Sequence, residues 1–185
     1  MPVDAESMEE LRRAEPTAVH RLVTDYQTAL YRFFHCRHQN HHAAEELTAE
    51  TFLQLIRALP SFRGDASQVR AFVFAVARNV LSHWYRRQTN ITADIDHESH
   101  AAMATAVPVD QLVQSEETAW LLQQVSELDE APRDIILMRY VEDLTLQEIA
   151  HVMQMPLGTV KSHLHRGRRQ LRTAAAVKGY AHESR

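Results

Sequence analysis

Cysteine and glycine are both rare in this chain of 185 residues, which contains one cysteine and four glycines. A single cysteine excludes a disulfide within the chain. Few glycines, scarce runs of Val, Thr and Ile, and abundant Ala, Leu, Arg, Glu and Gln together predict an all-α protein.

Long apolar runs are also absent. The longest, RAFVFAVARNVL, is broken by Arg78 and Asn79, and it falls short of the roughly 20 residues that a membrane-spanning helix needs. The first residues, MPVDAESMEE, have neither the basic nor the apolar segment of a secretory signal. We therefore expect a cytoplasmic protein that does not insert into a membrane and reaches one only through a partner.

The residue patterns of an enzyme are missing as well. The chain has no phosphate-binding glycine loop and no combination of a nucleophile with a base and an orienting residue. We expect neither catalysis nor a cofactor.

Charge is distributed unevenly beneath a net charge of -4. Residues 70–87 contain four arginines and no acid, residues 92–134 contain ten acids against one base, and residues 156–185 contain seven Lys or Arg against one acid. Two basic blocks that flank an acidic block suit two separate contacts with a polyanion.

Helical periodicity predicts two small helical domains joined by a linker. An N-terminal extension, residues 1–15, precedes a first domain, residues 16–88. Residues 89–114 form an acidic linker without periodicity, residues 115–176 form the second domain, and residues 177–185 form a tail. In the first domain, Ser67 is a candidate cap for a helix that runs to about Gln88.

The second domain carries the stronger local signal. Thr145 and Glu148 form a capping box for a short helix, a tight break follows at residues 154–156, and Gly158 or Thr159 begins a basic amphipathic helix. This order predicts a helix-turn-helix, whose second helix enters the major groove of DNA. Residues expected to meet base edges or nearby phosphates are Lys161, Ser162, His165 and Arg166, and those expected to meet phosphates are Arg168, Arg169 and Arg172. The alternative is a solvated basic helix on a helical bundle.

The last helix of the first domain carries a weaker signal. An exposed Arg78-Asn79 pair, the preceding loop SFRGDAS, and two aromatics beside Arg86 and Arg87 offer amide donors, stacking faces and cations. Such groups can hold unpaired bases and their backbone. The alternative is an amphipathic helix with arginines at one end.

Two blocks of the sequence resemble the two domains of extracytoplasmic-function (ECF) sigma factors of the sigma-70 family. The first is EELTAETFLQLIRALPSFRGDAS with RAFVFAVARN, and the second is ILMRYVEDLTLQEIAHVMQMPLGTVKSHLHRGRRQLR. The resemblance covers about residues 16–173. It implies region 2 in the first domain and region 4 in the second.

The resemblance also implies roles for individual residues. The clamp of the largest RNA polymerase subunit would be bound by Glu46, Glu50 and Thr51. Bases of the melted -10 promoter element would be held by Phe62, Arg63, Asp65, Ser67, Arg78 and Asn79, with Arg86 and Arg87 nearby. The duplex -35 element would be read by the helix that carries Thr159, Lys161, Ser162, His165, Arg166, Arg168 and Arg169.

The partners implied by the resemblance are the polymerase core, including the flap of the second-largest subunit, promoter DNA and an anti-sigma factor, which is often membrane-anchored in this family. The chain departs from the family pattern at several positions, among them Glu46, His83, Pro132, Gln154 and His163. The alternative function is a stand-alone helix-turn-helix regulator with a helical sensor domain.

The stretch HCRHQNHH, residues 35–42, holds four histidines and the only cysteine. If a helix continued through it, His35, His38 and His42 would share one face with a spacing that suits Zn, Ni or Cu. We favour the alternative of a polar, solvent-facing turn and therefore predict no metal site.

Overall fold

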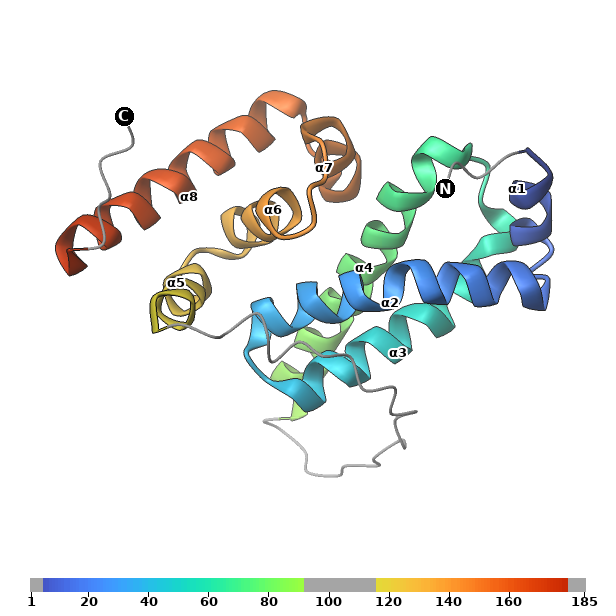
Figure 1. Cartoon of the computed structure of the whole chain (residues 1–185), viewed down its shortest axis with the longest axis horizontal. Coiled ribbons are helices and arrows are strands. Elements are labelled where there is room, and N and C mark those ends of the chain that lie inside the picture. Colours follow the sequence, from blue (N-terminus) through green and yellow to red (C-terminus); the bar gives the residue numbers. More distant parts are fainter. Residues whose placement is uncertain (1–4, 92–115, 180–185) are drawn as a thin grey trace. The chain divides into compact units, whose positions relative to one another are not determined.

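The computed structural model describes residues 5–91 and 116–179 (Figure 1). Every regular element in these ranges is helical, which confirms the predicted all-α fold. Most of the predicted acidic linker, residues 1–4 of the extension and residues 180–185 of the tail lie outside the described residues, so the predicted domain bounds stay predictions. None of the helices in the described ranges combines the length and the apolar character needed to cross a membrane.

The first compact unit contains α1 (Ala5–Arg12), α2 (Pro16–His38) up to Tyr31, α3 (His41–Ala58) and α4 (Val69–Ile91). Pro16 begins α2, where a missing backbone N–H costs least. Helix α3 packs against α4, and the apolar side chains at the centre of the unit are fully buried, namely Leu30, Leu47, Leu55, Leu59 and Phe74.

Two short 3-10 turns, η1 (Leu59–Ser61) and η2 (Ala66–Gln68), connect α3 to α4. The predicted cap at Ser67 is wrong, because Asp65 is the residue that caps η2. The Asp65 carboxylate accepts hydrogen bonds from the backbone N–H of Ser67 at 2.9 Å and from its hydroxyl at 2.6 Å. Gln68 completes the capping box by accepting from the backbone N–H of Asp65 at 3.2 Å.

The second compact unit contains residues 32–40, at the end of α2, together with α5 (Glu116–Ser126), α6 (Glu130–Tyr140), α7 (Leu146–Met153) and α8 (Leu157–Lys178). Two ion pairs hold the end of α2 within this unit. Arg37 Nε lies 2.8 Å from Asp134 Oδ1 in a buried pair, and Arg32 donates two hydrogen bonds of 2.8 Å to the buried carboxylate of Glu142. Truncating one member of such a buried pair is strongly destabilising.

Helices α7 and α8 form the predicted helix-turn-helix. The capping box of α7 is present, because Glu148 N–H donates to Thr145 Oγ1 at 3.2 Å and Thr145 N–H donates to Glu148 Oε2 at 2.7 Å. The turn after α7 places Gln154 in the left-handed region, with φ of 52°. Helix α8 packs against both α6 and α7. Gly167 allows a close approach of α8 to α6, because a Cβ there would lie 2.6 Å from Ile136 Cδ1.

Candidate nucleic-acid and polymerase interfaces

A groove of about 470 Å³ lies between α3 and α4 in the first unit. Its walls are Glu50, Gln54 and Ala58 from α3, and Val76, Asn79, Val80, His83 and Arg87 from α4. Gln54 donates a hydrogen bond of 2.7 Å to Glu50 Oε1, which orients that carboxylate. The fold thus brings Glu50, predicted to bind polymerase, into one groove with Asn79 and Arg87, predicted to bind the -10 element.

The three residues predicted to bind polymerase differ in exposure. Glu46 is exposed and Glu50 is half-buried. Thr51 is fully buried, and its hydroxyl donates a hydrogen bond of 2.7 Å to the Leu47 carbonyl one turn earlier in α3. The expectation that Thr51 presents a contact surface is therefore corrected, because its side chain belongs to the core of the first unit.

The loop of residues 62–67 presents charged side chains on an ordered backbone. The ring of Phe62 stacks on Phe72 with 4.4 Å between ring centroids and covers Gly64, where a Cβ would lie only 2.4 Å from that ring. Arg63, Asp65 and Ser67 are exposed. The hydrogen bond from the Ser67 hydroxyl lowers the pKa of Asp65, so the loop carries a carboxylate at neutral pH.

Helix α4 displays some of its predicted contact residues and partly hides one. Asn79, Arg86 and Arg87 are exposed, whereas Arg78 is half-buried. The Nε atom of Arg78 is buried and lacks a hydrogen-bond acceptor within the described part of the chain. The expectation of an exposed Arg78-Asn79 pair is therefore correct for Asn79 and wrong for Arg78.

Helix α8 exposes one polar and basic face. All seven side chains predicted for the -35 element are exposed, namely Thr159, Lys161, Ser162, His165, Arg166, Arg168 and Arg169. The opposite face is held by Val160, which is fully buried. Arg166 Nη2 lies 3.0 Å from His163 Nδ1 and can donate a hydrogen bond to it, so the side chain of Arg166 is braced by a neighbour one turn away.

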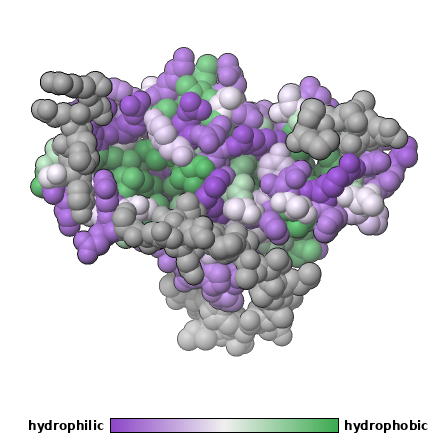
Figure 2. Space-filling view, in the orientation of Figure 1, coloured by the Kyte–Doolittle hydropathy of each residue, from purple (hydrophilic) through white to green (hydrophobic). Residues whose placement is uncertain are grey.

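An apolar groove of about 720 Å³, which the sequence did not reveal, lies between α5 and α8. Trp120 and Gln124 form one side, and the other contains Ala174, Val177, Arg166 and Arg169. Figure 2 shows hydrophobic residues gathered over α5 and α6 beside α8.

Two family models match successive parts of the chain. Residues 22–91 match sigma-70 region 2, and residues 118–171 match sigma-70 region 4. The RNA polymerase sigma-H factor of Pseudomonas aeruginosa is 30% identical over 179 residues, which cover 89% of this chain and 90% of that protein. The chain belongs to the ECF sigma factors of the sigma-70 family.

A more distant relative agrees with this assignment, and a solved structure shares the fold. The ECF sigma factor BldN of Streptomyces coelicolor is 27% identical over 90% of this chain, and this chain spans 63% of the length of BldN. The sigma factor RpoE of Bartonella quintana, solved with the anti-sigma factor NepR, shares the fold with a TM-score of 0.64 at 19% identity. That match covers 85% of this chain and 96% of RpoE.

The histidine-rich stretch of the sigma factor is not one continuous helix. Helix α2 ends at His38, Gln39 adopts φ of 51°, and α3 begins at His41, so His35, His38 and His42 do not share a helix face. No group of three or more His, Cys, Asp or Glu in the described ranges could hold a metal ion. Residues 39–42 are exposed as predicted, but Cys36 and Arg37 are buried, which corrects the expectation of a wholly solvent-facing turn. Burial raises the pKa of Cys36 to about 11, so its thiol stays protonated at neutral pH.

Proposed function

We propose that this sigma factor binds core RNA polymerase and directs promoter-specific initiation by recognising a melted -10 element and a duplex -35 element. The observation that carries the proposal is that one chain presents two different polar surfaces. Helix α8 exposes a polar, basic face beside a capped α7, and the groove between α3 and α4 joins an acidic residue to amide and guanidinium donors. The sigma factor would perform no chemistry of its own and would act in the cytoplasm.

Duplex recognition is assigned to α8. The major groove of B-DNA admits an α-helix, and an arginine can donate two hydrogen bonds to the O6 and N7 atoms of guanine. Arg166 is the candidate for this role, whereas Arg168, Arg169 and Arg172 suit phosphates. Arg166→Ala should cost about 1–3 kcal/mol and relax the base preference at one -35 position. The control Arg172→Ala should lower the affinity for all DNA sequences equally, and the same uniform loss of affinity for Arg166→Ala would reassign Arg166 to a phosphate contact.

Recognition of unpaired bases is assigned to the first unit. Extruding a base from a duplex costs a few kcal/mol, so a site that binds the extruded base favours melting. Asn79 is exposed in the α3–α4 groove and can both donate and accept hydrogen bonds at a base edge. Asn79→Ala should impair open-complex formation, measured by permanganate reactivity of unpaired thymines, while affinity for core polymerase stays unchanged. Loss of core binding would contradict this role.

Polymerase docking is assigned to Glu46 and Glu50 on α3, which would meet the clamp of the largest subunit, and to the second unit, which would meet the flap of the second-largest subunit. Charge reversal at the exposed Glu46 should reduce affinity for core polymerase and leave the fold intact. An unchanged affinity would remove Glu46 from the interface.

We also infer regulation by an anti-sigma factor. The support is the fold shared with RpoE, which was solved together with its anti-sigma factor. Purification of the tagged sigma factor from its own cells, before and after stress, would test this inference. Recovery of core polymerase alone under every condition would contradict it.

The stand-alone regulator is distinguished by its independence from polymerase. Such a regulator would bind its duplex site tightly with no polymerase present. The proposed sigma factor should give a specific, melted complex only after core polymerase has been added.

A further inference from the structure

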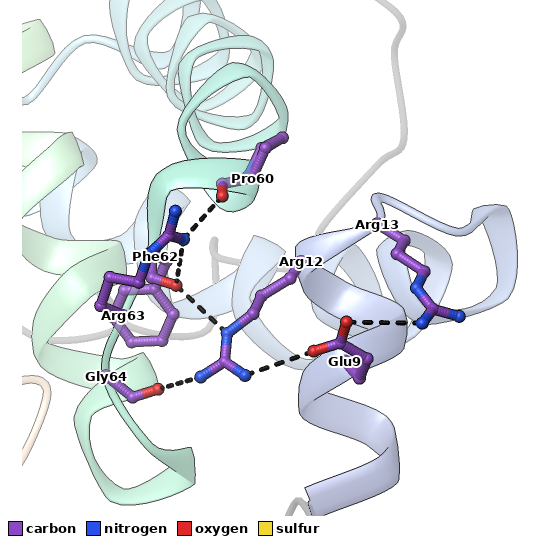
Figure 3. A network of polar contacts seen from close by, with 7 residues as sticks. All are labelled: Glu9, Arg12, Arg13, Pro60, Phe62, Arg63 and Gly64. Atoms are coloured by element: carbon purple, nitrogen blue, oxygen red, sulfur yellow. Dashed lines mark hydrogen bonds and ion pairs between the residues drawn. The ribbon is translucent and has the colours of Figure 1, made fainter.

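Arg12, at the end of α1, holds the loop that follows α3 (Figure 3). Its Nε donates to the Phe62 carbonyl at 3.2 Å, and its Nη2 donates to the Gly64 carbonyl at 2.9 Å. Its Nη1 lies 3.4 Å from Glu9 Oε2, so the guanidinium is also held from its own helix. The two carbonyls are separated by Arg63, and one planar group therefore spans the whole bend of the chain.

Helix α1 is itself fixed to the first unit. Met8 and Leu11 are buried, with 4% and 5% of their surfaces exposed. Glu10 forms an ion pair with Arg21 on α2. The turn after α1 is closed by the backbone hydrogen bond from Glu15 to the Glu10 carbonyl, 3.0 Å long. These contacts fix the position of α1, and with it the position of Arg12 beside the loop.

The held segment determines how the neighbouring charged side chains are presented. The Arg63 side chain donates to the Pro60 carbonyl at 2.8 Å, and Asp65 caps η2 immediately after the bend. Arg12 is half-buried, with 31% of its side chain exposed, and its Nε and Nη2 donors are directed at the loop backbone. A lysine has a single nitrogen and cannot reproduce the fixed fork of a guanidinium.

We propose that Arg12 is a positioning residue for base recognition: it fixes the backbone of residues 62–64 so that Arg63, Asp65 and Ser67 meet unpaired bases in a preset arrangement. Arg12 would act without touching DNA. This inference rests on the proposed role of the loop in binding the -10 element, and it adds α1 to the recognition apparatus. Ordering the loop before DNA arrives removes an entropy cost from binding.

The test compares Arg12→Ala, Arg12→Lys and the control Arg13→Ala in the full chain bound to core polymerase. Arg13 is the next residue, is 66% exposed and pairs with Glu9 alone among the described residues, so the control removes the same charge without touching the loop. The probe is a single-stranded DNA oligonucleotide enriched from a random pool by the wild-type complex. Hydrogen exchange of residues 62–65 is measured in parallel, together with melting temperature and core affinity.

Arg12→Ala and Arg12→Lys should both weaken probe binding about five- to tenfold and speed exchange in the loop, since both lose the paired hydrogen bonds. Arg13→Ala should stay within about twofold of wild type in the same assays. Equal behaviour of the Arg12 and Arg13 variants, or a loss of core affinity that matches the loss of probe binding, would overturn the proposal.

Asn79→Ala separates this inference from the proposed function. If Asn79→Ala weakens the probe and the Arg12 variants do not, the positioning role is wrong and the -10 assignment stands. If no oligonucleotide is enriched, or if neither Asn79→Ala nor loop substitutions affect it, the -10 assignment fails. In that case unchanged loop exchange in Arg12→Ala would also overturn the structural role of Arg12.

Discussion

Gly167 lies at the contact of α8 with α6, and adding one methyl group there tests how α8 is seated. A Cβ at this position would lie 2.6 Å from Ile136 Cδ1 and 3.3 Å from Pro132 Cβ. Replacing glycine by alanine in a helix gains about 1 kcal/mol of propensity, whereas overpacking costs about 1–3 kcal/mol. Ile136 is only 4% exposed and has little room to move. We therefore expect Gly167→Ala to lower the free energy of unfolding of the second unit by about 1 kcal/mol.

A double-mutant cycle isolates the clash. Ile136→Val removes the Cδ1 atom that the new methyl group would meet, and alone it should cost about 1 kcal/mol. In the Gly167→Ala background it should cost nothing or restore stability, which gives an interaction energy of about 1 kcal/mol. The control Gly158→Ala, where no atom lies within 4 Å of the added Cβ, should be neutral or stabilising.

The assay is urea unfolding followed by the fluorescence of Trp120, in a Trp84→Phe background that silences the first unit. Gly167→Ala should also weaken binding of -35 duplex DNA, because α8 would be displaced from its seat. A stabilisation equal to that of Gly158→Ala, or strict additivity with Ile136→Val, would refute the close approach of α8 to α6.

Three further predictions concern the second unit. Arg37→Met removes the partner that lies 2.8 Å from buried Asp134 and should lower the free energy of unfolding in urea by about 3–5 kcal/mol. Adding Asp134→Leu should recover much of this loss, and an undiminished urea midpoint in Arg37→Met would contradict the buried pair. Gln154→Gly relieves the left-handed backbone at φ of 52° and should raise the free energy of unfolding by about 1 kcal/mol. A lower melting temperature would show that the Gln154 side chain stabilises the fold by more than the backbone strain costs. Burial, followed by the charges of Arg37 and Arg133, lowers the pKa of His38 to about 4 from 6.5, so the unfolded chain binds more protons between these pH values and stability should fall as pH drops from about 6.5 to 4. His38→Gln should reduce the fall of the urea midpoint between these pH values, and an unchanged dependence of the midpoint on pH would refute the role of His38.

Local signals in the sequence were sufficient to predict much of the fold. The α7 capping box depends on Thr145 and Glu148, three residues apart, and both of its hydrogen bonds form as the pattern predicts. Such contacts are encoded within one helical turn, so they are readable without knowledge of the tertiary structure.

Contacts between distant residues could not be predicted in this way. Arg12 meets the Phe62 carbonyl 50 residues later, and Arg37 meets Asp134 97 residues later. Thr51 has a polar side chain, yet its hydroxyl donates a hydrogen bond to the Leu47 carbonyl within α3, so its burial costs little free energy. The candidate site was therefore predicted best where exposure follows helix periodicity, as on α8, and least well where packing decides exposure, as at Arg78.

Run-off transcription with purified core polymerase tests the central claim most directly. The template is a promoter identified by mapping transcripts that appear when the sigma factor is overproduced. The account predicts a transcript of defined length only when the sigma factor is added. It also predicts a clear reduction of that transcript in both Asn79→Ala and Arg166→Ala at protein concentrations that still saturate the core. Initiation by core polymerase that is equally specific without the sigma factor, or tight promoter binding by the sigma factor alone with no transcript, would contradict the claim.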